Sequence, residues 1–339
     1  MNRGAAAAIG AAVLFGAGTP LAKLMLGPLG PWTMAGLLYL GSGLGLLIYR
    51  LAARMPSPAL SAPELGWFAG AIASGGVAGP LLLMFGLGGM PASEASLLLN
   101  AEAVFTALLA WFAFRENFDA RIALGMLAIV AGALVLAWRG GGSGGSALAV
   151  LGACLAWALD NNLTRKISVA DASWIASVKG LASGAVNLAI AFALGAKTPE
   201  AGLAARAMTL GFFAYVLSLT LFVVGLRHLG TARTGAYFSI APFFGALLAV
   251  AIGDKPTPGL AVAGALMAIG VWLHLTERHE HAHFHEEMWH DHEHVHDLHH
   301  QHQHDTPVEP GTRHRHAHRH SPMSHSHPHF PDIHHRHVH

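Results

Sequence analysis

Apolar runs of about 20 residues follow one another along the first 275 residues, and this feature limits the fold more than any other. A helix of that length crosses the hydrocarbon core of a bilayer, which is about 30 Å thick. Hydrocarbon offers no hydrogen-bond partner to a backbone amide, so each run must satisfy its amides within one helix. We therefore predict an all-α integral membrane protein with ten transmembrane helices, at residues 5–26, 31–50, 66–88, 93–113, 119–138, 147–166, 172–195, 206–227, 232–252 and 257–275.

The scarcity of charge supports this prediction. Only 12% of the 339 residues are Asp, Glu, Lys or Arg, against about 25% in a soluble domain. Ten of the 19 acidic residues lie in 277–339, so nine carboxylates remain for the membrane portion. Nine are too few to solvate a globular protein of that size, so the expected partner is the lipid bilayer. No nucleic-acid partner is expected. An enzyme is not expected either, because no nucleophile–base pair or Gly-rich phosphate loop is recognisable.

The two halves of the membrane portion resemble each other. Residues 105–110 (FTALLA) recur as 244–249 (FGALLA), in register with flanking matches. We divide the chain into a first five-helix repeat at 1–138, a Gly/Ser linker at 139–146 and a second five-helix repeat at 147–275. Because each repeat has an odd number of spans, the second is predicted to be inverted relative to the first. Inverted repeats are a recurrent transporter architecture.

The Lys and Arg residues of the loops predict the orientation. Loops that share a face with the N-terminus carry nine of these residues, and the opposite loops carry four. The excess of positive charge marks the cytoplasmic side. The sequence therefore predicts a multi-pass protein of the cell (inner) membrane with both termini in the cytoplasm.

Three short motifs resemble the EamA family of the drug/metabolite transporter superfamily. They are Phe15–Lys23 (FGAGTPLAK), Ala92–Glu102 (ASEASLLLNAE) followed by Glu116, and Ala241-Pro242-Phe243 with Asp254. The chain departs from the family pattern at Ala103, where proline is usual, and at Asp254, where glutamate is usual. The resemblance implies ten helices around a central cavity that opens alternately to either side. It also implies a small-molecule substrate that is moved mostly outward. A homodimer is a possible oligomeric state.

Polar residues inside the spans are the candidate substrate-binding set: Asn100, Glu102, Asp160, Asn161, Asn162 and Lys179. An ionisable group at mid-span costs about 2.5–3.5 kcal/mol on insertion scales, so each asks for a reason. The functional hypothesis is that these residues line the cavity and that one carboxylate couples transport to a proton or cation. The alternatives are structural. Asp160–Asn162 can cap the end of their helix, Lys179 can neutralise Asp160, and Glu102 can pack between helices. Lys23 is expected to extend its ammonium toward the membrane surface.

The tail at 276–339 holds 23 of the 25 histidines. Neutral imidazole together with carboxylate suits Zn, Ni, Co and Cu(II). The candidate metal ligands are His279, His281, His283, His285, His290, His292, His294, His296, His314, His316, His318 and His320. With prolines and few large apolar residues, the metal-free tail is expected to be disordered. No cofactor is expected to be required apart from a divalent metal (Zn, Ni or Co) on this tail.

Three classes of function are open at this point. A secondary transporter of small metabolites or drugs, acting as an exporter, accounts for the ten spans, the repeat and the resemblance. A divalent metal exporter, or a metal-regulated permease, accounts for these and the tail, but the spans lack soft ligands. A membrane-anchored metal sensor or store accounts for the tail alone. We favour the first reading.

Overall fold

The structure, a computed structural model, divides the chain into two compact units, Met1–Thr276 and Glu277–His339. Each unit is described by itself. The residues that the structure describes are 3–58, 60–114, 120–138, 144–167 and 171–276 of the first unit, and 280–285, 288–294, 314–320 and 323–328 of the second.

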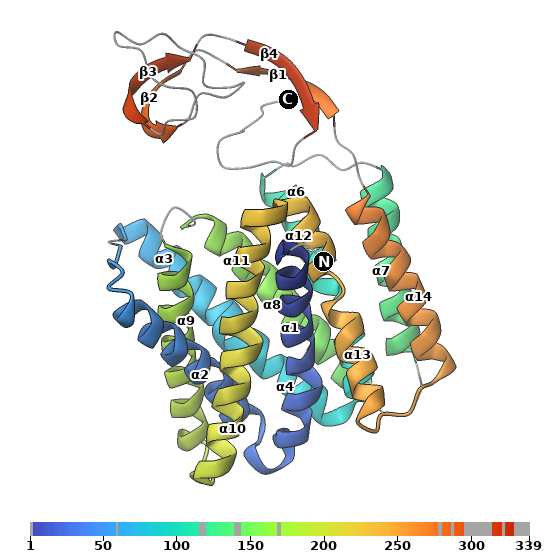
Figure 1. Cartoon of the computed structure of the whole chain (residues 1–339). Coiled ribbons are helices and arrows are strands. Elements are labelled where there is room, and N and C mark those ends of the chain that lie inside the picture. The colour runs from blue at the N-terminus through green and yellow to red at the C-terminus, as the bar shows by residue number, and fades with distance from the viewer. Residues whose placement is uncertain are drawn as a thin grey trace. The chain divides into compact units, whose positions relative to one another are not determined.

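The first unit is a helical bundle (Figure 1). Its first half consists of α1 (Arg3–Leu29), α2 (Pro31–Ala52), α3 (Ala62–Ala71), the π-helical segment η1 (Ile72–Ala78), α4 (Gly79–Gly89), α5 (Ala92–Leu98), α6 (Ala101–Phe114) and α7 (Ala120–Ala137). Its second half consists of α8 (Gly144–Arg165), α9 (Ala172–Ala193), α10 (Ala201–Gly211), the π-helical segment η2 (Phe212–Leu217), α11 (Ser218–Leu229), α12 (Thr231–Phe238), α13 (Ala241–Ala251) and α14 (Pro258–Leu275).

The second half repeats the first, element by element. Each described element of the second half begins 138 to 141 residues after its counterpart. The third span of each half contains a π-helical segment, η1 in one and η2 in the other. The fourth span of each half is broken in the middle, at Leu99–Asn100 and at Ser239–Ile240. The two-repeat prediction from short sequence matches is therefore confirmed by the order of the elements.

The predicted spans agree with the helices to within five residues at every end that the structure describes. Nine of the described helical segments are long and apolar enough to cross a membrane, and Arg121–Ala137 is a shorter apolar helix. The fold class is thus the predicted all-α multi-pass membrane protein. Residues 115–119, which precede the shorter helix, lie outside the described residues.

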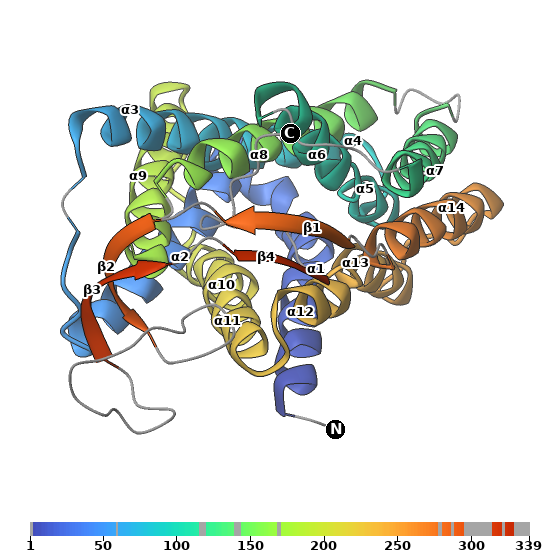
Figure 2. The same ribbon diagram turned by 90° about the horizontal axis from the view of Figure 1, so that it is seen from above.

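Contacts between the repeats organise the bundle. Helices α2 and α9, the second spans of the two repeats, pack together at one end of the bundle, and α7 and α14, the fifth spans, pack together at the other (Figures 1 and 2). Between these pairs, α1 packs on α11 and α4 packs on α8. Helices α1 and α8 are equivalent in the two repeats, and so are α4 and α11. The operation that relates the repeats therefore converts the α1–α11 contact into the α8–α4 contact. This exchange is the arrangement expected of inverted repeats.

Glycine permits the close approach of α2 and α9. A Cβ atom added to Gly43 would lie 2.4 Å from the backbone nitrogen of Leu181, and one added to Gly184 would lie 2.7 Å from that of Leu40. Neither helix can move a backbone atom out of the way without moving as a whole. Small residues at such crossings give lipid-embedded helices their van der Waals contact.

The second spans of both repeats end in the same turn. Met55 N donates to Arg50 O (3.0 Å) after α2, and Ala196 N donates to Ala191 O (2.9 Å) after α9. The residue before each of these donors has a left-handed backbone: Gly195 has φ 85°, and Arg54 has φ 50°. This pattern is the Schellman motif, whose left-handed position is usually glycine. Arg54 is the only non-glycine residue with positive φ among those described.

The linker is shorter than we predicted. Residues 144–146 form the first turn of α8, whereas residues 139–143 lie outside the described residues. The reason is a tertiary contact with α4. A Cβ atom on Gly89 would lie 2.2 Å from the Oγ atom of Ser146, and one on Gly86 would lie 2.9 Å from Ser146 O. Packing against these glycines extends α8 backward into a segment whose composition indicates a flexible loop.

The described residues of the second unit form four strands: β1 (Glu280–His285), β2 (Met288–His294), β3 (His314–His320) and β4 (Met323–Pro328). They form two two-stranded antiparallel sheets, β1 with β4 and β2 with β3. The composition predicted disorder for the metal-free tail. An isolated two-stranded sheet is only marginally stable in water. These two sheets are therefore compatible with a tail that is disordered without metal, and the disorder stays a prediction.

Substituting Gly43 with alanine should lower the free energy of unfolding by about 1–3 kcal/mol, because the new methyl group would push α9 away from α2. Gly66→Ala is the matched control: Gly66 also lies within a helix, and its added methyl group would meet no atom within 4 Å. Alanine there should be neutral or stabilising by up to about 1 kcal/mol. Thermal unfolding in detergent micelles measures both. Equal midpoints for the two variants would contradict this description of the α2–α9 contact.

Candidate substrate site in the bundle interior

An ion pair between α8 and α9 forms the centre of the candidate site. The Lys179 Nζ atom of α9 contacts Asp160 Oδ2 of α8. Thr164 Oγ1 donates to the other carboxylate oxygen, Asp160 Oδ1, at 3.0 Å. Asp160 is only 5% exposed. A buried carboxylate needs such partners, because an unpaired charge in low dielectric is costly.

The π-helical segment η1 of the first repeat packs directly on this pair. A Cβ atom on Gly75 would lie 1.9 Å from Asp160 Oδ2, and one on Gly76 would lie 1.8 Å from the Oγ atom of Ser183 in α9. A larger residue at either position would therefore require the Asp160 or Ser183 side chain to move. The polar side chains of α8 and α9 lie against bare backbone of the first repeat.

Side chains from three helices bind the carbonyl groups of η1. Gly75 O accepts hydrogen bonds from the hydroxyl group of Tyr39 (2.8 Å) and from Nε1 of Trp157 (3.0 Å). Gly76 O accepts one from Nδ2 of Asn187 (3.1 Å). Single-turn π-helical segments inside α-helices occur frequently at functional sites. Here the π-helix gathers α2, α8 and α9 around two carbonyl groups.

Two polar atoms next to η1 are buried without a hydrogen-bond partner among the described residues. They are Ser183 Oγ and Asn187 Oδ1, on residues that are 0% exposed. Leaving a buried polar atom unsatisfied costs about 1–3 kcal/mol, so a native structure rarely does so without a reason. A site where water or a solute binds these two atoms would provide such a reason.

A second carboxylate lies beside the ion pair. Asn161 Nδ2 of α8 donates to Glu102 Oε1 of α6 at 2.9 Å, and Asn161 is exposed. Glu102 comes from the first repeat and Asn161 from the second. The cluster thus contains two carboxylates and one ammonium group, a net charge of −1 when all three are ionised.

Aromatic rings of both repeats continue from the polar cluster. The rings of Tyr39 and Tyr215 have centroids 5.6 Å apart, and Tyr215 lies 6.2 Å from Phe15. Phe15 in turn lies 5.4 Å from Phe238. The hydroxyl end of Tyr39 therefore contacts η1 while its ring begins an aromatic row through η2, α1 and α12.

The structure brings together Glu102, Asp160, Asn161 and Lys179, but it uses the other two predicted residues differently. Asn162 Nδ2 donates to Ala158 O of its own helix at 2.9 Å. Asn100 Nδ2 donates to Leu97 O at 2.9 Å, at the break between α5 and α6. Both amides satisfy local backbone.

Lys23 has partners at the end of a neighbouring span. Its ammonium group donates to Leu87 O at 2.9 Å and to Met90 O, both at the end of α4. A cation at a helix C-terminus is stabilised by the carbonyl groups that lack an intrahelical partner. Nearby, Ser93 N at the start of α5 donates to Asp254 Oδ2 of the second repeat at 2.8 Å.

Among the described residues there is no group of three or more His, Cys, Asp or Glu residues that could hold a metal ion. In the tail, His279 and His296 lie outside the described residues, and the other predicted ligands fall within strands β1, β2 and β3.

Sequence reasoning did not select Tyr39, Trp157 or Ser183 as site residues. Tyrosine, tryptophan and serine are common in membrane helices, and only their contacts with η1 distinguish these three. The available signal was the run Ser74-Gly75-Gly76 in the middle of a span. Adjacent glycines can indicate close approach of another backbone or ligand.

Comparison with known proteins decides the family. The sequence pattern of the EamA-like transporter family matches residues 2–138 and 145–276. The chain belongs to this family. Each match covers one repeat, which agrees with the division of the helices. It is accordingly a multi-pass membrane protein of the EamA-like transporter family.

Two further proteins are similar to this EamA-like chain. An uncharacterized transporter of Methanothermobacter thermautotrophicus is 32% identical over 208 residues, which are 58% of this chain and 60% of the relative. The match thus spans about three fifths of that relative. A solved structure, titled as a crystal structure of a protein, shares the fold with a TM-score of 0.59 and 22% identity. The match covers 79% of this chain and 95% of the other.

The Asp160–Lys179 pair should behave as one unit in stability measurements. Asp160→Asn or Lys179→Met alone leaves a buried charge without its partner, which should cost about 3–5 kcal/mol. The double variant should lose clearly less than the sum. Lys197→Met, at an exposed lysine, is the control for loss of positive charge. Thermal unfolding in micelles gives the stability of these four variants. If the effects of the two single substitutions add up in the double variant, the two side chains do not form a coupled ion pair.

Proposed function

We propose that this EamA-like chain is a secondary transporter that exports small metabolites or drugs across the cell membrane by alternating access. The supporting observation is the polar cluster at the contact between the repeats, where η1 of one repeat lies against Asp160 and Ser183 of the other. A site between two inverted repeats changes its access when one repeat rocks against the other. Both termini are proposed to lie in the cytoplasm.

The pairing within the cluster bears on the substrate class. Lys179 is paired with Asp160, so its positive charge is already balanced within the cluster. Glu102 and the exposed amide of Asn161 remain, next to the aromatic row that begins at Tyr39. Carboxylate with aromatic faces suits a cation or a neutral solute with hydrogen-bond donors. We therefore propose such solutes as substrates, with Glu102 exchanging a proton or cation during transport.

Transport of the organic cation tetraphenylphosphonium into inside-out vesicles tests this proposal. Glu102→Gln removes the carboxylate charge that attracts the cation, and Asn161→Ala removes the hydrogen bond to that carboxylate, which contributes about 1.5–3 kcal/mol. Each should lower the rate by about tenfold or more. Asn162→Ala is the matched control, because the Asn162 amide binds its own helix. Membrane abundance is measured for each variant. Wild-type rates in both Glu102→Gln and Asp160→Asn vesicles would reject the site.

The tail is proposed to bind divalent metal on the cytoplasmic side. The backbone register of its strands supports this proposal. The register sets histidine opposite histidine at five positions: His290–His318, His292–His316, His294–His314, His281–His327 and His283–His325. Opposite residues of an antiparallel pair have Cβ atoms about 4.5–5.5 Å apart, a separation at which two imidazoles can share one ion. Transport of the metal itself remains the alternative function.

Zinc and nickel titration of the full-length protein in micelles, followed by calorimetry, tests the tail. Deleting 277–339 should abolish tight binding, because 23 of the 25 histidines are removed. His228→Ala with His274→Ala, which removes the two others, should leave binding unchanged. Equal heats from the full chain and the deletion variant would overturn metal binding by the tail. If the deletion variant lost zinc efflux but still transported tetraphenylphosphonium, the result would favour a metal exporter.

A further inference from the structure

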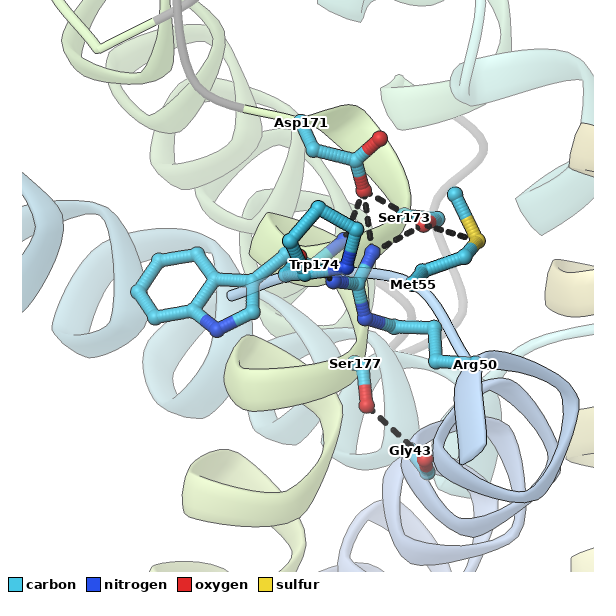
Figure 3. A network of polar contacts seen from close by, with 8 residues as sticks. Gly43, Arg50, Met55, Asp171, Ser173, Trp174 and Ser177 are labelled. Atoms are coloured by element: carbon cyan, nitrogen blue, oxygen red, sulfur yellow. Dashed lines mark hydrogen bonds and ion pairs between the residues drawn. The ribbon is translucent and has the colours of Figure 1, made fainter. Parts of the chain in front are cut away.

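A second polar network lies outside the substrate site, at the junction of α2, the loop after it and the start of α9 (Figure 3). Arg50 is 5% exposed. Its guanidinium group donates to Asp171 Oδ1 and Ser173 Oγ through Nη1, and to Pro56 O (2.6 Å) through Nη2. A guanidinium group has five N–H donors, and three of them have acceptors among the described residues. Two remain for a ligand.

Asp171 keeps this arginine in place. The Asp171 carboxylate accepts hydrogen bonds from Ser173 Oγ (2.5 Å) and from the backbone nitrogen of Trp174 (2.8 Å), and so caps α9. These hydrogen bonds, the one from Ser173 first, and the charge of Arg50 hold the pKa of Asp171 below its ordinary value. The carboxylate therefore stays ionised at neutral pH, and the guanidinium group is held in one orientation.

A cavity of about 410 Å³ opens beside Arg50. Its polar lining includes Arg50, Arg54 and Ser57, and its apolar lining includes Leu51 and Val178. The volume falls within the range of about 300–1,000 Å³ typical of ligand sites. Leu51 is 68% exposed, so the apolar wall continues onto the surface of a membrane-spanning helix. The lining of the cavity thus combines basic and apolar side chains.

Arg54 provides an independent observation. Arg54 has a left-handed backbone conformation, φ 50°, and the equivalent residue of the other repeat is Gly195. A residue with a Cβ atom is strained there, and such strain is retained where the side chain has a function. Arg54 is exposed; its backbone nitrogen donates to Leu51 O (3.2 Å), whereas its guanidinium group has no hydrogen-bond or ion-pair partner among the described residues. Its charge is available to a ligand in the cavity.

We propose that this cavity binds the headgroup of one anionic phospholipid. The phosphate would contact Arg50 and Arg54, Ser57 would donate to the headgroup, and the acyl chains would follow Leu51 and Val178 along the groove between α2 and α9. Basic pockets between membrane helices at the cytoplasmic surface bind anionic headgroups in this way. A bound lipid would bridge the second spans of the two repeats. This inference does not depend on the transported solute.

Native mass spectrometry of the full-length protein tests the proposal by comparing retention of phosphatidylglycerol and phosphatidylcholine. Arg54→Gly should fold normally, because Gly195 shows that glycine suits this turn. It should bind phosphatidylglycerol about fivefold more weakly or worse, and phosphatidylcholine as before. The control Arg227→Ala removes an exposed arginine near the end of α11 and should leave both lipids unaffected.

Two results would overturn the proposal. Equal losses of phosphatidylglycerol in Arg54→Gly and Arg227→Ala would indicate diffuse attraction to a basic surface. Displacement of the lipid by millimolar inorganic phosphate would indicate a site for free phosphate. A thermal unfolding midpoint of Arg54→Gly at or above that of the parent excludes misfolding as the cause of any loss.

Discussion

Every polar group in the hydrocarbon must find its partner within the protein, and the rest of this structure depends on that constraint. It makes the spans helical, and it decides where they deviate. The π-helical segment η1 presents two carbonyl groups, which accept from Tyr39, Trp157 and Asn187. The carbonyl groups at the end of α4 accept from Lys23. Ser183 Oγ and Asn187 Oδ1, next to η1, are among the buried side-chain atoms that have no hydrogen-bond partner in the described residues.

The inverted repeats share their backbone but not their chemistry. Equivalent helices break, bulge and turn at corresponding residues, yet the ion pair Asp160–Lys179 belongs to the second repeat alone. The turn after the second span uses glycine in one repeat and Arg54 in the other. The symmetry therefore lies in the backbone, whereas the polar side chains differ between the two repeats.

Much of the fold was predictable, because a span in lipid leaves a simple signal: about 20 apolar residues without charge. The ionisable residues of the candidate site were predictable for the same reason, since Glu102, Asp160 and Lys179 are conspicuous in apolar sequence. Asn100 and Asn162 were selected by type, although their amides bind local backbone. Tyr39 and Trp157 escaped notice because their residue types are ordinary in membrane helices, and only their contact with Gly75 O sets them apart.

The sequence by itself determined the solvent, the number of spans and the duplication, because hydropathy and repetition are properties of the chain read in one dimension. It also determined that a histidine-rich segment follows the bundle. Only the tertiary structure decided which polar groups meet. The partner of Lys179 is 19 residues away, whereas Gly75 lies more than 80 residues before Trp157. Such contacts depend on how helices cross, and the crossing brings together residues that are far apart in the sequence.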